Sequence, residues 1–201
     1  MDEQRRQLIQ AAVALGAAAI APPWQEAGQR KAGTEERTAF DPIPPRPKVP
    51  TPGKPGDFDF LAGRWRITHR KRLPNNGGWD TFSGEATCWS ILGGVGSVEE
   101  LLIPERNFSG MGLRLLDVKA RQWSDFWVNA KSGVLATPGQ TGSFEQGVGL
   151  FISEYEEEGR TMLAAGVWDR ITAHSCRWRQ ATSADGGRTW VHDWIMDWRK
   201  A

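Results

Sequence analysis

The larger part of the chain alternates apolar and polar residues in short runs, which glycine, asparagine, aspartate and proline separate. A two-residue period is typical of strands with one buried face, and no window of a dozen residues carries the 3.6-residue period of an amphipathic helix. The pattern predicts strands at residues 63–71, 79–91, 97–104, 109–118, 122–130, 141–146, 148–155, 160–170, 174–182 and 188–199. About ten antiparallel strands within residues 58–201 predict one all-β domain, either a closed meander or a sandwich.

The same alternation separates the two faces of each strand. In the strand at 174–182, Trp178 and Gln180 lie opposite two arginines, and in the last strand His192 falls on the same face as Trp194. His69 shares its face with tryptophan and isoleucine, again opposite arginines. Charged faces are expected to meet water, so the tryptophan-rich faces point inward. Because a buried indole N–H needs a hydrogen-bond partner, these rings suit the wall of a cavity better than a dry core.

The first 57 residues differ in composition from the strand region. Within residues 1–21, Arg5-Arg6 precedes a short alanine-rich apolar stretch, which is the order of a twin-arginine export signal. Residues 22–57 hold most of the prolines and predict an extended linker. We therefore expect a disordered or helical N-terminal extension and a periplasmic or secreted protein. If residues 1–21 instead form a short helix that packs on the domain, the protein is cytoplasmic.

Composition excludes several classes of protein. The net charge is +1, without a basic stripe, so nucleic acid is not an expected partner. No apolar run reaches the length of a membrane span, so no integral membrane segment is expected after removal of the signal. Two cysteines provide neither a disulfide framework nor a structural zinc site, and no metal site is expected. The unusual feature is aromatic: 11 tryptophans accompany 1 tyrosine and 8 phenylalanines.

Several motifs in order along residues 57–199 resemble a known group. They are DFDFLAGRW, ILGGVGSVEE, GMGLRLLD, QWSDFW, GSFEQGVGLF and ITAHSCRWRQATSADGGRTW, followed by a tryptophan-rich final strand. The set resembles uncharacterised bacterial lipocalin-like proteins of the calycin superfamily, closer to the nitrobindin-like branch. The resemblance implies an up-and-down β-barrel of about ten strands. It carries no established common activity.

The resemblance also implies roles for particular residues. In calycins the tryptophan of a Gly-x-Trp element, here Trp65, closes the barrel floor, and a basic residue of the last strand covers it. Arg199 is the positional candidate for that basic residue. Nitrobindin-like barrels bind haem through one lumenal histidine, for which His192 is the better-placed candidate. Haem is therefore an alternative to the main expectation, which is that no cofactor is bound.

Residues 183–190, SADGGRTW, match the Asp-box of sialidases and other propellers. The motif occurs once, and no repeat of 40–50 residues is present to build a propeller. We therefore interpret it as a tight turn before the last strand, with Trp190 packed at the start of that strand.

The pattern predicts one pocket in the lumen. Its expected aromatic walls and polar contacts are Trp127, Trp168, Trp178, Trp194, His69, Arg114, Gln180 and His192. Each of the two histidines is either a satisfied polar residue of the lumen, a hydrogen-bonding partner of a ligand, or a haem ligand or proton-transfer group. Arg114 either faces outward or anchors an acidic group of the ligand.

Three functions fit these features. The first is a binding module that holds an apolar or aromatic small molecule in a tryptophan-lined lumen. The second is an enzyme of lipocalin-like fold, such as an isomerase, a hydratase or a haem-dependent enzyme, acting in the same cavity. The third is a structural domain whose aromatic core is full. Ionisable pairs in the lumen would favour the enzyme, and an unbroken apolar lining would favour the carrier.

Overall fold

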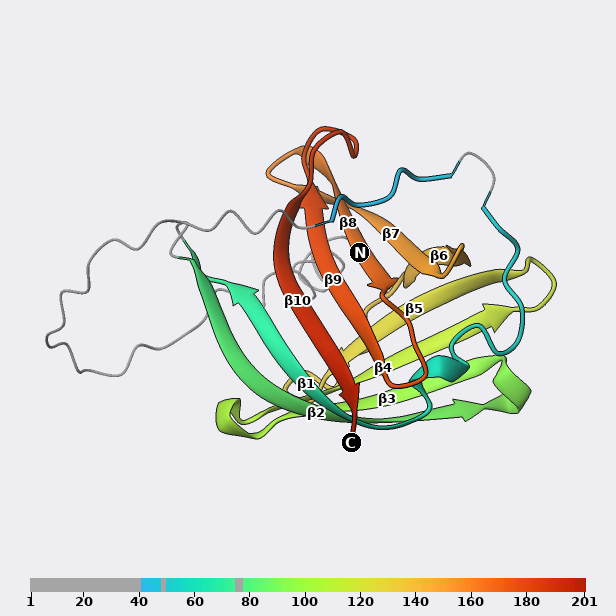
Figure 1. The fold of residues 1–201 in the computed structure, drawn as a ribbon. Helices are drawn as coiled ribbons and strands as arrows, with labels where there is room; N and C mark the ends of the chain where they lie inside the picture. Colours follow the sequence, from blue (N-terminus) through green and yellow to red (C-terminus); the bar gives the residue numbers. More distant parts are fainter. Residues whose placement is uncertain (1–40, 48–49, 75–77) are drawn as a thin grey trace, which may run out of the picture.

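A computed structural model describes residues 41–47, 50–74 and 78–201. Ten antiparallel strands close into a barrel in which each strand neighbours the next along the chain and β1 meets β10 (Figure 1). The strands are β1 (Gly63–Arg72), β2 (Trp79–Ile91), β3 (Gly96–Ile103), β4 (Phe108–Asp117), β5 (Gln122–Asn129), β6 (Gln140–Glu145), β7 (Val148–Glu157), β8 (Arg160–Asp169), β9 (Ser175–Ser183) and β10 (Val191–Lys200). The predicted all-β barrel is confirmed. The export signal predicted at residues 1–21 lies outside the described residues.

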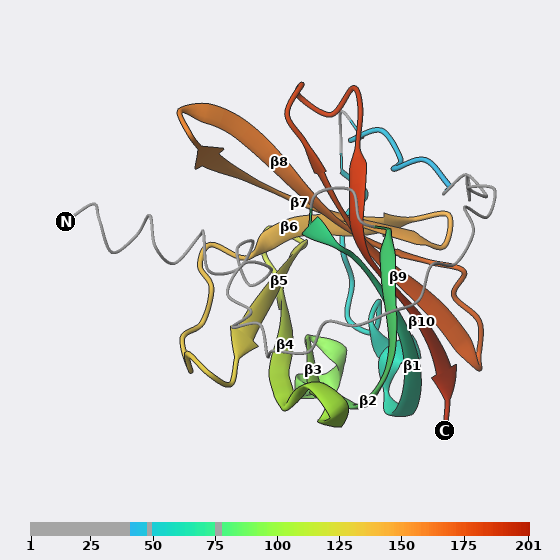
Figure 2. The same ribbon diagram turned by 90° about the vertical axis from the view of Figure 1, so that its left-hand side faces the viewer.

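The ladder between β1 and β10 closes the barrel. It runs from Trp65 opposite Lys200 to Lys71 opposite Trp194. Figure 2 shows β3–β5 on the far side of the barrel from β9 and β10. The pairing of β5 with β6 is short and ends at Asp125 opposite Gln140, beyond which residues 130–139 connect the two strands. No helix in the described part of the chain is long and apolar enough to cross a membrane.

Aromatic side chains fill one end of the barrel, which we call the floor. The 3-10 helix η1 (Asp59–Leu61) lies beneath it, and Trp65 donates a hydrogen bond from Nε1 to the carbonyl oxygen of Leu61 at 2.6 Å. The Lys200 ammonium lies 4.1 Å from the centre of the Trp65 ring. The basic residue over Trp65 is therefore Lys200, and the expectation of Arg199 is wrong by one residue, because Arg199 is exposed on the outer face. The rest of the floor consists of Phe58, Trp123, Phe144, Phe151, Trp168 and Trp198.

The described end of the expected linker packs on the barrel. We call residues 41–47 the strap, the blue segment beside β8 and β9 in Figure 1. Ile43 is 7% exposed and contacts an apolar cluster on the outer face of β7–β9, formed by Ile152, Ala165, Val167 and Ala181. The strap has no regular secondary structure, but it does not extend into solvent, because this outer face is apolar and needs cover.

The strap also buries the two arginines of β9. Arg177 and Arg179 are 4% and 1% exposed, and both donate hydrogen bonds to Asp169 on β8. Arg177 also pairs with the Asp41 carboxylate at 2.5 Å, and Arg179 donates to the Asp41 carbonyl oxygen. The expectation that this charged face meets water is wrong at both arginines, because residues from the linker region supply their partners.

The turn between β9 and β10 has the structure predicted for the Asp-box sequence. Asp185 accepts hydrogen bonds from the backbone N–H groups of Arg188 and Thr189, and Ser183 Oγ accepts one from Gly187. Hydrogen bonds from the backbone N–H and the hydroxyl of Thr189 and from the Ser183 hydroxyl lower the pKa of Asp185 to about 2. Trp190 then packs against the apolar cluster under the strap. The motif is a structural turn.

Candidate functional site

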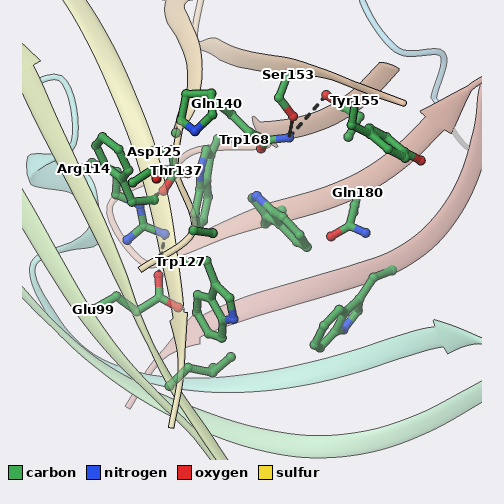
Figure 3. A pocket seen from close by; sticks show the side chains of 18 of the residues that line it. Glu99, Arg114, Asp125, Trp127, Thr137, Gln140, Ser153, Tyr155, Trp168 and Gln180 are labelled. Carbon is green, nitrogen blue, oxygen red and sulfur yellow. Dashed lines mark hydrogen bonds and ion pairs between the residues drawn. The ribbon is translucent and has the colours of Figure 1, made fainter. Parts of the chain in front are cut away.

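A cavity of about 190 Å³ lies in the lumen above the floor (Figure 3). An apolar cavity of about 150 Å³ is large enough to bind benzene, so this one has room for a small ring compound. Six of the eight predicted site residues line it: Arg114, Trp127, Trp168, Trp178, Gln180 and Trp194. His69 and His192 do not. Residues 136–139, from the connection between β5 and β6, form part of the rim.

Two tryptophans from neighbouring strands form a corner of the cavity wall. The rings of Trp178 on β9 and Trp194 on β10 have centroids 6.3 Å apart and planes at 81°. Glycines on adjoining strands leave room for the wall. A Cβ on Gly110 would lie 2.2 Å from the Trp127 ring, and one on Gly166 would lie 3.3 Å from Trp178 Nε1. Any larger residue at Gly110 therefore displaces Trp127 and changes the cavity.

His69 lies behind this wall. Trp194 Nε1 donates a hydrogen bond to His69 Nδ1 at 3.2 Å, and the imidazole stacks on Phe82 with ring centroids 4.8 Å apart. Because Nδ1 accepts a hydrogen bond, the neutral ring carries its proton on Nε2, which points at Gly84. Burial lowers the pKa of His69 to about 4. His69 therefore positions Trp194 and presents no ring nitrogen to the cavity.

His192 lies on the outside of the barrel, so the prediction of a lumenal His192 is wrong. A β-bulge between His192 and Trp194 interrupts the two-residue alternation of β10. As a result His192 pairs with Ala181 on the outer face, and its Nε2 lies 2.9 Å from Arg179 Nη1. Burial and the two arginines of β9 lower the pKa of His192 to about 4.

The bulge brings Asp193 to the inner side in place of His192. Gln180 Nε2 donates a hydrogen bond to Asp193 Oδ2 at 3.1 Å, which fixes the Gln180 amide at the cavity wall. Burial raises the pKa of Asp193. With His192 outside, His69 Nδ1 taken up by Trp194 and His69 Nε2 directed at Gly84, the residues present do not fit a lumenal haem ligand.

Three charged side chains from neighbouring strands meet at one side of the cavity. Arg114 on β4 donates a hydrogen bond from Nη2 to Glu99 Oε2 on β3 at 2.6 Å, and its Nε lies 3.1 Å from Asp125 Oδ1 on β5. Figure 3 shows this set on the opposite side of the cavity from Gln180 and Tyr155. Burial raises the pKa of Asp125 to about 6, although Arg114 acts in the opposite direction.

Glu99 and Asp125 are the buried carboxylates of the site that the sequence analysis missed. The signal was present, because Asp125 alternates in phase with Trp123 and Trp127, and Glu99 in phase with Leu101. We overlooked their inward phase because we expected charged residues to face water. The partners also lie on separate strands, and the register that joins Arg114 to Asp125 becomes visible only in the folded barrel.

Gln140 completes the polar lining near the rim. Its Nε2 donates hydrogen bonds to Ser153 Oγ at 3.3 Å and to the Ala164 carbonyl oxygen at 3.2 Å (Figure 3). These bonds connect β6 to β7 and β8 across the cavity wall. The lining as a whole therefore combines large apolar rings with a few fixed polar groups, the composition typical of a small-molecule site.

Comparisons with known proteins name no activity. No protein-family model matches the chain, and no curated protein matches it. Among solved structures, the chain is similar to a protein of unknown function from the DUF3598 family of Nostoc punctiforme PCC 73102, with 12% sequence identity and a TM-score of 0.42. The similarity covers 77% of this chain and 53% of that protein, so the chain spans about half its length. A likeness at this level says nothing of function, and the lipocalin and nitrobindin resemblance stays a prediction.

Proposed function

We propose that the protein binds an apolar or aromatic small molecule in the lumen of its barrel. The observation that carries the proposal is the cavity of about 190 Å³ walled by Trp127, Trp168, Trp178 and Trp194. A full aromatic core would pack these rings against one another without such a space. Apolar burial supplies most of the affinity, and the polar groups at the two sides orient the molecule.

A cavity-filling variant tests this proposal. Ala164 on β8 lines the cavity, and Ala164→Leu extends a side chain into it. We expect the wild type to bind indole and 2-naphthol in calorimetric titrations and Ala164→Leu to lose most of that binding. The unfolding midpoint of the variant shows whether the fold is kept. Trp89→Ala is the control, because Trp89 is 46% exposed outside the cavity.

Native mass spectrometry of the protein purified from its own cells provides a second measurement. The proposal predicts a retained small molecule that is absent from the Ala164→Leu variant. If indole and 2-naphthol bind equally well to both forms, the molecules bind outside the lumen and the proposal is wrong. If neither probe binds the wild type and no molecule is retained, the cavity is not a ligand site.

A second candidate function is proton transfer by Asp125. The observation that favours it is a buried carboxylate beside the cavity whose pKa is raised to about 6. A general base is most efficient when its pKa lies near the pH at which the protein works. An aromatic ketone with exchangeable hydrogens, such as acetophenone, tests it. Protein-dependent deuterium exchange into the acetophenone methyl group that is lost in Asp125→Asn supports this function, and exchange at the solvent rate rejects it.

A further inference from the structure

The charged groups that line the cavity do not balance. They are three carboxylates, Glu99, Asp125 and Glu154, and one guanidinium, Arg114. Glu154 lies at the exposed rim and pairs with Arg46 on the strap at 3.4 Å. The buried set therefore has two carboxylates for one guanidinium. An unbalanced charge in a buried site is costly unless a proton or a partner of opposite charge compensates it.

The positive charge of the set is covered by protein. The Arg114 side chain is 5% exposed, and its guanidinium carbon lies 5.7 Å from the centre of the Phe58 ring and 5.3 Å from that of Trp168. Its Nη1 and Nε atoms are fully buried. Neither of these two atoms makes a hydrogen bond within the described part of the chain, but both are enclosed by protein, and Nη2 already donates to Glu99. An acidic ligand group therefore has no exposed guanidinium nitrogen to reach.

The negative charge is accessible. The Asp125 side chain is 14% exposed and lies in the cavity wall, whereas the Glu99 side chain is 2% exposed. Arg114 contacts Glu99 through Oε2 and Asp125 through Oδ1. The second oxygens, Glu99 Oε1 and Asp125 Oδ2, make no hydrogen bond with any described residue. The inner side of the cavity thus presents acceptor oxygens that carry negative charge.

The aromatic walls suit the body of such a ligand. The rings of Trp178 on β9 and Trp194 on β10 stand at 81° to each other and offer two apolar faces at one corner of the cavity. These strands lie on the far side of the barrel from β3–β5, which carry Glu99, Arg114 and Asp125 (Figure 2). The charged side of the cavity and its aromatic side can therefore hold different parts of one ligand.

We propose that the lumenal cavity takes a small organic cation, an ammonium group carried on an apolar or aromatic body. This inference rests on the proposed function and names the class of its ligand. The ammonium lies at Asp125 and Glu99, where it supplies the missing positive charge, and the body lies among the tryptophans. An anion of the same shape meets two carboxylates, and a neutral molecule leaves the buried charge unbalanced.

Three probes that share one ring and differ in charge test the inference: benzylamine, benzyl alcohol and benzoate. Calorimetric titration of the full chain at neutral pH gives an affinity for each. We expect benzylamine to bind roughly tenfold or more tightly than benzyl alcohol, and benzoate to bind weakest. Asp125→Asn should remove the preference, so that this variant binds benzylamine no more tightly than benzyl alcohol.

A matched variant controls for overall charge. Asp197→Asn removes a carboxylate from the outer face of β10, where Asp197 pairs with Arg70, and should leave all three affinities unchanged. Glu99→Gln provides a second lumenal variant if Asp125→Asn does not fold. It too should weaken benzylamine binding more than benzyl alcohol binding.

The outcomes separate this inference from the proposed function. If benzyl alcohol or benzoate binds as tightly as benzylamine, the cavity binds small molecules but does not select cations, and only the inference is wrong. A preference for benzylamine that survives both lumenal variants places the cation outside the charged set and also overturns the inference. If none of the three probes binds, the proposed function fails as well.

Discussion

Asp125 shares its positive neighbour, Arg114, with a second carboxylate, Glu99. Burial disfavours the ionised form of Asp125 more strongly than the shared Arg114 guanidinium favours it. The pKa of Asp125 therefore rises to about 6. At neutral pH the protein therefore holds a carboxylate in the barrel that would be more stable in water. A residue kept at a cost to stability inside an otherwise aromatic lumen is typical of a binding or catalytic site.

The first prediction concerns the pH dependence of stability. Between pH values of about 4 and 6, Asp125 is protonated in the folded state, whereas in the unfolded chain it has already released its proton. The contribution of Asp125 to the stability of the folded state is therefore lost as the pH rises through about 6. Asp125→Asn removes the effect. The variant should gain roughly 2 kcal/mol in the free energy of unfolding relative to wild type between pH 4 and pH 7.

Urea denaturation of both proteins across this pH range measures the difference. Because His69 and His192 titrate in both proteins, their contributions cancel. A difference that stays flat, or that changes in favour of the wild type as pH rises, would show that the Asp125 carboxylate is not destabilised by burial.

At the scale of residues, the sequence predicted most of the aromatic wall and missed the two buried carboxylates of the polar site. Alternation placed Trp178 and Gln180 correctly because β9 is regular. The alternation misplaced His192, because no local sequence signal indicates the bulge that directs this residue outward. It failed at Glu99 and Asp125 because their burial depends on a partner from a third strand.

The strap is the element that the sequence described least well. Proline content predicted an extended segment, and residues 41–47 do lack regular structure. Composition could not indicate that Ile43 has an apolar cluster to cover, because that cluster forms only when β7, β8 and β9 align. The strap also supplies Asp41, which pairs with both Arg170 and Arg177 and has its pKa lowered by them.

The second prediction tests whether the strap contributes to the fold. Ile43→Ala should lower the free energy of unfolding by roughly 2 kcal/mol, the low end for buried aliphatic truncations, because the strap lies on the surface. Val191→Ala is the control, since Val191 is 51% exposed and should change little. Equal urea midpoints for Ile43→Ala and wild type would mean that the strap does not stabilise the barrel.

At the scale of the whole molecule, the barrel has one filled end and one hollow region. Phe58, Trp65, Trp123 and Trp198 pack the floor, at the end of the barrel where Trp65 pairs with Lys200. Regular alternation over ten strands made this architecture predictable from the sequence. The alternation could not establish the cavity above the floor, because the packing of side-chain volumes in the folded barrel decides whether the lumen is filled or empty.

The third prediction concerns the floor. Trp65 is 1% exposed, hydrogen-bonded to Leu61 and covered by Lys200. Trp65→Ala should cost on the order of 3–5 kcal/mol, as large aromatic truncations do. The exposed Trp89 provides the comparison, and Trp89→Ala should stay within about 0.5 kcal/mol of wild type. Guanidinium denaturation that gives the same midpoint for both variants would contradict the described floor.

A crystal structure of the full chain with benzylamine shows whether the lumen is a ligand site. We expect density for the aromatic ring beside Trp178 and Trp194, with the ammonium within hydrogen-bonding distance of Asp125. A lumen in which the tryptophan rings close together and leave no space for the probe, or a probe found on the outside of the barrel, would contradict this expectation.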